Sequence, residues 1–156
     1  MYNYVKGIYF AKKRRNNKMA NELVTWSDDF LVHNAAIDEQ HKSLVKMANE
    51  FYANCQKGGI LARVYFFETI KGTLRYVKTH FSTEEDIMKK ANYPEYEEHK
   101  KQHEDFIIHV QEQISNFEKQ INPDSAGFVK ILTDWILQHI AASDKDYIPY
   151  IAKLNV

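Results

Sequence analysis

The stretch "EEHKKQHEDFIIHV", residues 97–110, decides the fold, because its apolar face runs on into two histidines. Phe106 and Val110 stand one helical turn apart, which is typical of the buried face of an amphipathic helix. Three and then seven residues before Phe106 stand His103 and His99, so both imidazoles extend the buried face. A lone buried histidine is more often a core residue than a ligand. Two of them one turn apart indicate a metal site.

Three more apolar stripes of the same helical period lie along the chain, with most of the glycines and prolines near their boundaries. The connections are short, so consecutive helices should be antiparallel neighbours. We therefore predict an all-α protein, an up-down-up-down four-helix bundle with a short C-terminal helix. We expect Asp38 to cap the first helix and Pro94 to lie in the first turn of the third. The predicted helices span residues 38–57, 62–91, 94–119, 126–142 and 144–153.

Composition narrows the class of protein. A chain of 156 residues that is 44% hydrophobic can bury one core, and its formal net charge of zero argues against a surface for nucleic acid or an anionic membrane. Cys55 is the only cysteine, which excludes a disulfide framework and a thiolate metal cage. We therefore expect a cytoplasmic protein with a small ligand, and with neither a nucleic acid nor a membrane as partner.

The first 18 residues differ from the rest of the chain in their pattern of apolar and basic residues. Their apolar run is far short of a membrane span, and the basic cluster follows it, the reverse of a signal peptide. We expect residues 1–18 to be a flexible N-terminal extension and residues 19–156 to form the domain. The alternative is an upstream mis-start, because Met19 opens the part of the sequence that looks globular.

The other three apolar stripes also carry residue types that bind metals. "HFSTEE" places His80 and Glu84 one turn apart on the second helix, although an exposed His–Glu pair would have the same spacing. "IDEQHK" places His41 near the start of the first helix, where an ordinary histidine is the alternative. "HIAASD" separates His139 and Asp144 by five residues, which an ideal α-helix would swing well apart. That pair can share a site only through a π-like turn or a helix break.

Their positions along the helices bring these residues together. They lie near the starts of the first and third predicted helices and near the ends of the second and fourth. In an antiparallel bundle those four ends are the same end. Seven side chains should therefore converge in one layer: His41, His80, Glu84, His99, His103, His139 and Asp144.

The composition of this set suggests two transition-metal ions. Five imidazoles and two carboxylates are too many donors for one tetrahedral zinc and too rich in nitrogen for calcium or magnesium. Two carboxylates can bridge a pair of metals, and the paired cations would offset the cost of burying the two anions. Iron is the natural choice, and manganese is not excluded.

Four motifs, "IDEQHK", "HFSTEEDIM", "EEHKKQH" and "HIAASDKDY", in this order and spacing, resemble the hemerythrin family, specifically the single-domain bacterial hemerythrins. The resemblance covers about Leu23 to Leu154 and fills every ligand position. It implies two iron ions joined by an oxo or hydroxo group. It assigns the seven residues as follows: His99, His103 and His139 on one iron, His41 and His80 on the other, and Glu84 and Asp144 bridging the two.

The resemblance also implies that dioxygen binds at the iron with two histidines. Around that position the sequence supplies apolar side chains, Phe81, Trp135 and Ile136, which would exclude water and protons. They are equally suited to be plain core residues. We expect Tyr147, three residues after Asp144, to support the ligands from behind.

Two further histidines are poor candidates. His33 precedes "NAAID" and is expected on the surface or over the mouth of the pocket, and His109 falls off the apolar face of its helix. No Glu-x-x-His motif of the ferritin-like di-iron enzymes occurs in the sequence. Fewer anionic ligands stabilise high-valent iron less, which favours reversible binding over oxidative chemistry.

The sequence therefore predicts a monomeric oxygen-binding protein, not an enzyme, for storage, delivery or buffering of dioxygen. A di-iron oxidase or reductase acting on peroxide or nitric oxide is the main alternative, and it would need an unidentified electron donor. A sensor working with a separate partner and a metal-storage protein are further alternatives. Storage predicts more than two metals per chain.

Overall fold

The computed structural model describes residues 22–119 and 124–154. The expectation of an extension over residues 1–18 lies outside the described residues and stays a prediction. Four long helical segments form the body: α2 (Ala35–Cys55), α3 (Gly59–Lys90), α4 (Tyr96–Glu118), and α5 (Ser125–Asp134) continued by η3 (Trp135–Ser143). Short helices complete it: η2 (Asp28–Phe30), α6 (Asp144–Asp146), α7 (Ile148–Ile151) and η4 (Ala152–Leu154).

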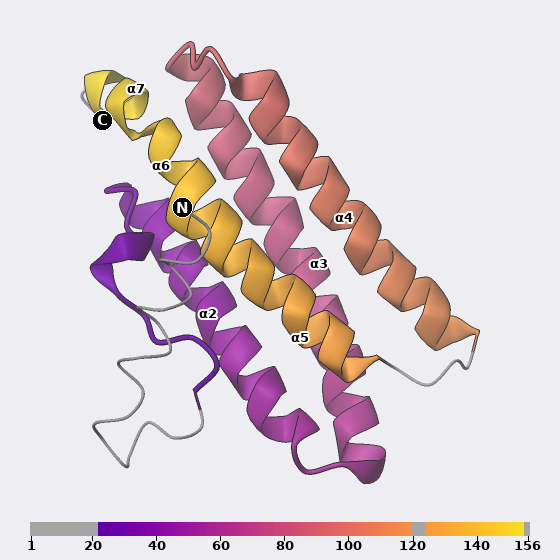
Figure 1. Ribbon diagram of the computed structural model, residues 1–156. Helices are drawn as coiled ribbons and strands as arrows, with labels where there is room; N and C mark the ends of the chain where they lie inside the picture. The colour runs from indigo at the N-terminus through magenta and orange to yellow at the C-terminus, as the bar shows by residue number, and fades with distance from the viewer. Residues whose placement is uncertain (1–21, 120–123, 155–156) are drawn as a thin grey trace.

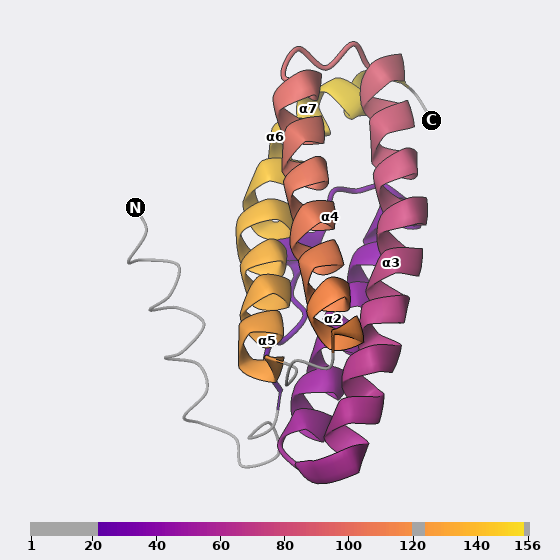
Figure 2. The same cartoon turned by 90° about the vertical axis from the view of Figure 1, so that its right-hand side faces the viewer.

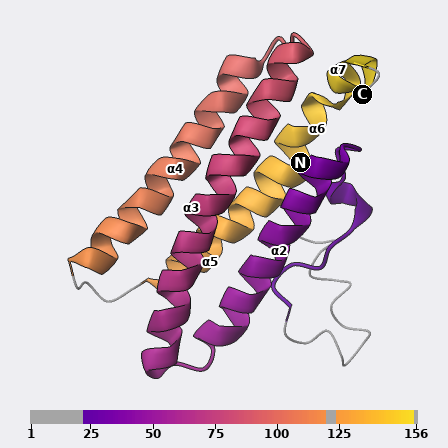
Figure 3. The ribbon, with the colours of Figure 1, turned by 180° about the vertical axis from the view of Figure 1, so that it is seen from behind.

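These helices form an up-down-up-down bundle, as predicted. Consecutive long helices run in opposite directions, so the α3–α4 turn and the C-terminal helices share one end, and the α2–α3 turn lies at the other (Figure 1). Seen from the side and from behind, the long helices stay closely aligned along their length (Figure 2, Figure 3). Strands are absent from the described ranges, and the predicted all-α class is confirmed.

The expected helix starts need two corrections. Asn34, not Asp38, caps α2, and its side chain accepts hydrogen bonds from the N–H groups of Ala36 and Ile37. Asp38 lies one turn inside and accepts a 2.8 Å hydrogen bond from the Val32 N–H, which ties the preceding loop to the helix. Pro94 lies in the turn before α4 instead of in its first turn, because the helix begins at Tyr96.

The fourth helix continues further than expected. The sequence predicts an end at residue 142 and a separate helix over 144–153. Instead the helix runs on through η3 into α6 and ends at Asp146, because η3 is a π-helix that keeps the backbone hydrogen-bonded through this stretch. The separate C-terminal helix is therefore shorter and starts at Ile148.

Two positive φ angles make the tight turn between α2 and α3. Gly58 and Gly59 have φ angles of 68° and 65°, a region that residues with a Cβ rarely enter. Nothing lies within 4 Å of where a Cβ would be placed on either glycine, so backbone conformation and not crowding requires glycine here. This turn lets α3 return directly along α2.

Two hydrophobic clusters fill the bundle. The larger one runs along its centre and includes the contacting rings of Phe51, Phe66 and Phe128. The smaller one closes the end that carries the α3–α4 turn, and it includes Met88 and Tyr147. Of the helices in the described part of the chain, none is long and apolar enough to cross a membrane. The polar residues buried between the two clusters form the candidate site.

Candidate metal centre

Seven buried side chains meet inside the bundle near its α3–α4 end. The side chains come from α2, α3, α4, η3 and α6, and none is more than 3% exposed. Burying this many titratable groups in one place is costly unless something compensates them. The structure brings together all seven of the residues that the sequence selected: His41, His80, Glu84, His99, His103, His139 and Asp144.

The atoms that face one another in this cluster are the ones that bind metals. The Nε2 atoms of all five imidazoles are buried, and none has a hydrogen-bonding partner among the described residues. The same holds for Oε2 of Glu84 and for both carboxylate oxygens of Asp144. Buried polar atoms are rarely left unpaired, so this set of unpaired nitrogen and oxygen atoms fits a bound cation.

The cluster divides into two groups of candidate ligands. Glu84 with His99, His103 and His139 forms one, and Glu84 with His41, His80 and Asp144 forms the other. Within each group the ligand atoms lie within 4.8 Å of one another. Two adjacent positions are therefore available, and Glu84 is common to both.

Asp144 faces both groups with different oxygens. Its Oδ1 lies 3.1 Å from Nε2 of His139 and 3.4 Å from Nε2 of His99. Its Oδ2 lies 3.2 Å from Nε2 of His41, on the other side. This is the arrangement that a carboxylate needs if it is to join two metal ions.

Glu84 reaches both groups with a single oxygen. Its Oε2 lies 3.2 Å from Nε2 of His80 and 3.2 Å from Nε2 of His103. Its Oε1 accepts a 2.5 Å hydrogen bond from the hydroxyl of Tyr147, which is fully buried. Tyr147 therefore fixes the carboxylate from behind.

A π-helix places His139 and Asp144 on the same site. The backbone N–H of Asp144 donates to the carbonyl of His139, five residues earlier, and the hydroxyl of Ser143 donates to the carbonyl of Gln138 in the same register. In an α-helix, residues five apart point roughly 140° away from each other, and the wider turn brings them back towards one face. Asp146, two residues further, is exposed.

The outer nitrogens of four imidazoles have partners that fix ring orientation. His41 donates from Nδ1 to the carbonyl of Phe30, the last residue of η2, at 3.1 Å. The other three partners are side chains on neighbouring helices: Gln40 for His80 at 3.0 Å, Glu85 for His103 at 3.3 Å, and Gln102 for His139 at 2.8 Å. With Nδ1 donating its proton, Nε2 is free to bind a metal.

The electrostatics of the metal-free cluster show how strongly it favours positive charge. Burial lowers the pKa of His41, but the carboxylates of Asp144 and Glu84 raise it by more, to about 10. Burial raises the pKa of Asp144 to about 6, and the charge of Glu84 adds to this. Burial lowers the pKa of His80 to about 3, against the attraction of Glu84. A metal cation would offset the carboxylates as the His41 proton does in its absence.

Aromatic rings cover the cluster on the side of the large hydrophobic core. Phe81 stacks on His103 with ring centroids 3.8 Å apart, and Trp135 stacks on His139 at 3.7 Å. Ile136, which follows Trp135 in the sequence, is also fully buried. All three residues that the sequence proposed as pocket lining lie in the core. The stacked partners of Phe81 and Trp135 belong to the group with three histidines, whereas the sequence placed this lining around the other group; there, Phe81 only approaches His80, with ring centroids 5.7 Å apart.

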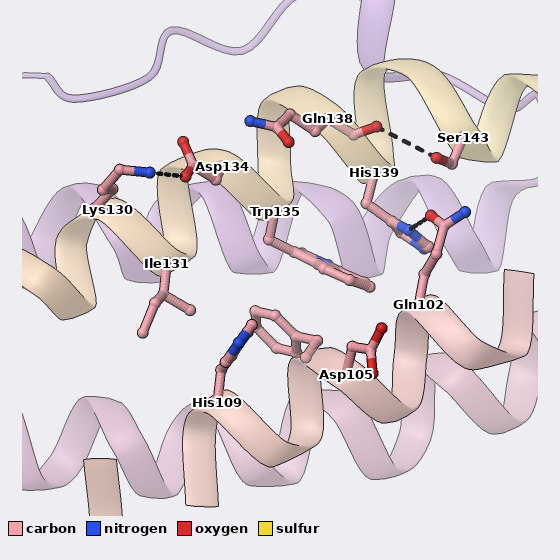
Figure 4. A pocket seen from close by; sticks show the side chains of 11 residues that line it. Gln102, Asp105, His109, Lys130, Ile131, Asp134, Trp135, Gln138, His139 and Ser143 are labelled. Atoms are coloured by element: carbon pink, nitrogen blue, oxygen red, sulfur yellow. Dashed lines mark hydrogen bonds and ion pairs between the residues drawn. The ribbon is translucent and has the colours of Figure 1, made fainter. Parts of the chain in front are cut away.

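The two discarded histidines lie away from the cluster. His33 is exposed, with a φ of 61°, and His109 is exposed on α4. His109 helps to line a groove of about 570 Å³ between α4 and the α5–η3 helix, shown in Figure 4. Trp135 and His139 form the inner wall of this groove, and Gln102 reaches across to His139 (Figure 4).

Sequence reasoning missed Tyr76 and the side chains that hold the imidazoles. Tyr76 stacks on His80 with centroids 4.6 Å apart. It stands one turn before His80, so helical spacing alone could have found it. Gln40, Glu85 and Gln102 are each next in sequence to a candidate ligand, but nothing in that position shows which neighbouring helix they reach.

A family model described as the hemerythrin HHE cation binding domain matches residues 32–151. The chain belongs to the hemerythrin family. All seven clustered residues lie inside the matched range. Hemerythrins bind non-heme iron, and the orphaned nitrogen and oxygen atoms of this centre are suited to it.

Curated relatives carry hemerythrin names. The chain is similar to the bacteriohemerythrin of Stenotrophomonas maltophilia, with 31% identity over 135 residues, which is 85% of each chain. It is 28% identical over 134 residues to the bacteriohemerythrin of Methylococcus capsulatus, covering 83% of this chain and 98% of the relative. A hemerythrin-like protein of Naegleria gruberi is 31% identical over 122 residues, 78% of this chain and 88% of the relative.

Proposed function

We propose that this hemerythrin binds dioxygen reversibly at a pair of iron ions, for storage, delivery or buffering. The observation that carries the proposal is the division of one buried cluster into two adjacent ligand groups that share Glu84. Two iron ions would supply the two electrons that reversible dioxygen binding uses. The names of the bacteriohemerythrin relatives agree with this assignment.

The two groups differ in the number of imidazoles. His99, His103 and His139 would hold one iron, and His41 and His80 the other, with Glu84 and Asp144 bridging the pair and an oxo or hydroxo group completing it. The second iron has fewer protein ligands, so it is the one with room for a small ligand. We therefore assign dioxygen to the side of His41 and His80.

The lining of the centre supports binding rather than turnover. Phe81 and Trp135 stack on His103 and His139, and the side chains of His41, His80, Glu84 and Asp144 are fully buried, so the side to which we assign dioxygen is closed to bulk water. Exclusion of water disfavours irreversible oxidation of the metals. We propose that the chain acts as a carrier and not as an enzyme.

The remaining assignments follow the sequence-based expectations. We propose that residues 19–156 form the hemerythrin-like domain, that the protein works as a monomer, and that it is cytoplasmic. The single cysteine suits a reducing compartment.

An optical experiment tests the proposal. Anaerobic, reduced protein with two irons per chain is recorded before oxygen, after oxygen, and after flushing with inert gas. We expect a visible absorption band that appears with oxygen and disappears on flushing over repeated cycles. A stable ferric spectrum that flushing leaves unchanged would favour the oxidase or reductase alternative, and more than two irons per chain would favour storage.

A further inference from the structure

Two polar groups inside the aromatic lining have no partner. The hydroxyl of Tyr76 and the indole Nε1 of Trp135 are both inaccessible to solvent, and neither makes a hydrogen bond within the described part of the chain. Buried tyrosine and tryptophan side chains normally find a partner for their polar atoms. Two such groups in one lining point to a ligand that supplies the missing acceptor.

The ring of Tyr76 is in direct contact with a candidate ligand of the metal centre. It lies against the imidazole of His80, with centroids 4.6 Å apart and ring planes 27° apart. The unpaired phenol oxygen is buried with this ring, on the side of the cluster where His80 stands.

Trp135 carries the second of these unpaired groups. Its indole N–H is buried and has no acceptor within the described part of the chain. An indole N–H can only donate, whereas a phenol can accept one hydrogen bond and donate another. Tyr76 stacks on His80, whereas Trp135 stacks on His139 in the other group, so of the two unpaired groups the phenol is the one beside His80.

We propose that Tyr76 donates a hydrogen bond to the small ligand that enters beside His80. The inference rests on the proposed function, since it assumes a metal with an open position on that side. It adds a polar contact to a lining that is otherwise apolar. Ligands that carry an acceptor atom or a negative charge are favoured at this position over ligands that carry neither.

Azide is a suitable probe, because it is a small anion with acceptor atoms. The experiment compares wild-type protein with Tyr76→Phe, both with iron bound and oxidised. Optical titration gives the azide dissociation constant, and infrared spectroscopy gives the azide stretching frequency in H₂O and in D₂O. Tyr52→Phe, which removes a hydroxyl from the half-buried outer part of α2, is the matched control.

We expect Tyr76→Phe to bind azide roughly 10-fold more weakly, the effect of losing one hydrogen bond to a charged group. We also expect the azide frequency to shift between H₂O and D₂O in the wild type and in Tyr52→Phe, and not in Tyr76→Phe. A purely structural role of Tyr76 would not remove this isotope shift.

The outcomes separate the inference from the function on which it rests. If the wild type takes up two irons and binds azide, but Tyr76→Phe keeps the same affinity and isotope shift, only the role of Tyr76 is overturned. If the wild type takes up no iron, the proposed function and the role of Tyr76 are both overturned.

Discussion

Gln102 on α4 accepts a 2.8 Å hydrogen bond from Nδ1 of His139 on η3, so one helix orients a candidate ligand of the next. The same relationship recurs around the bundle. In each case the supporting side chain is adjacent in sequence to a candidate ligand on its own helix: Gln40 beside His41, Glu85 beside Glu84, and Gln102 beside His103. The helices α2, α3 and α4 thus each contribute a ligand and position one on the next helix.

Replacing Gln102 should weaken metal binding without unfolding the protein. Gln102→Leu removes the acceptor that holds the His139 ring, and loss of such a partner typically costs about 10- to 100-fold in metal affinity. Competition with a chelator of known affinity measures the change. Gln111→Leu, at an exposed position of the same helix, is the control and should bind metal as the wild type does. Equal affinities for all three proteins would contradict the proposed role.

Removing the Tyr147 hydroxyl should destabilise the fold. Tyr147→Phe leaves Oε1 of Glu84 buried without its donor, and a buried hydrogen bond to a charged group contributes about 1.5–3 kcal/mol. Denaturant titration of the metal-free proteins measures the loss. Tyr150→Phe makes the same chemical change on a half-buried ring nearby and should cost much less. A similar loss from both variants would show that the contact with Glu84 is unimportant.

Asp144 and Asp146 should differ sharply in their effect on metal content. Asp144→Asn removes the anion whose two oxygens face the two ligand groups, so we expect fewer than two irons per chain. Asp146→Asn alters an exposed carboxylate two residues away and should retain full metal content. Elemental analysis after removal of loosely bound iron gives the ratio. Loss of iron from the second variant alone would mean that the π-helix does not set which aspartate is used.

The metal-free protein should be most stable near pH 6.5. The pKa of His41 is about 10 in the fold, above its ordinary value of 6.5, so its stabilising contribution is lost as the pH rises from about 6.5 towards 10. The pKa of His80, about 3, and the pKa of His139 both lie below that ordinary value because of burial, so folding loses stability as the pH falls below about 6.5. The raised pKa of Asp144, about 6, offsets only part of this loss. Denaturant titrations across this range should show a maximum.

The variant His41→Gln tests the expected loss of stability at alkaline pH. His41→Gln cannot carry the proton, so its stability should change less than that of the wild type between about pH 7 and pH 9. If the two proteins lose stability in parallel over that interval, His41 is not the group that titrates.

Much of the fold and of the site could be predicted because helices impose a period on the sequence. His99 and His103 continue the face of Phe106, and the structure buries all three. For His139 and Asp144 to share a site, their spacing required either a π-like turn or a helix break, and the structure shows the first of these in η3. The ends of the helices were less predictable, because Asn34 and Asp38 are both good caps and only the path of the preceding loop selects between them.

The supporting contacts could not be predicted for a different reason. Helical spacing fixes which side chains share a face, but not how far a neighbouring helix is rotated or shifted along its axis. Those two quantities decide that Glu85 meets His103 and that Tyr147 meets Glu84. They also leave the hydroxyl of Tyr76 beside His80 without a partner.

By itself, the sequence determined an antiparallel four-helix bundle and the seven side chains that converge at one of its ends. Both follow from apolar periodicity and from the positions of histidines and acids along each helix. Only the tertiary structure decided which oxygen of Asp144 faces which group, which side chains hold the imidazoles, and which polar atoms remain unpaired. Those features depend on packing between helices, where a shift of one side chain's length changes every hydrogen-bonding partner.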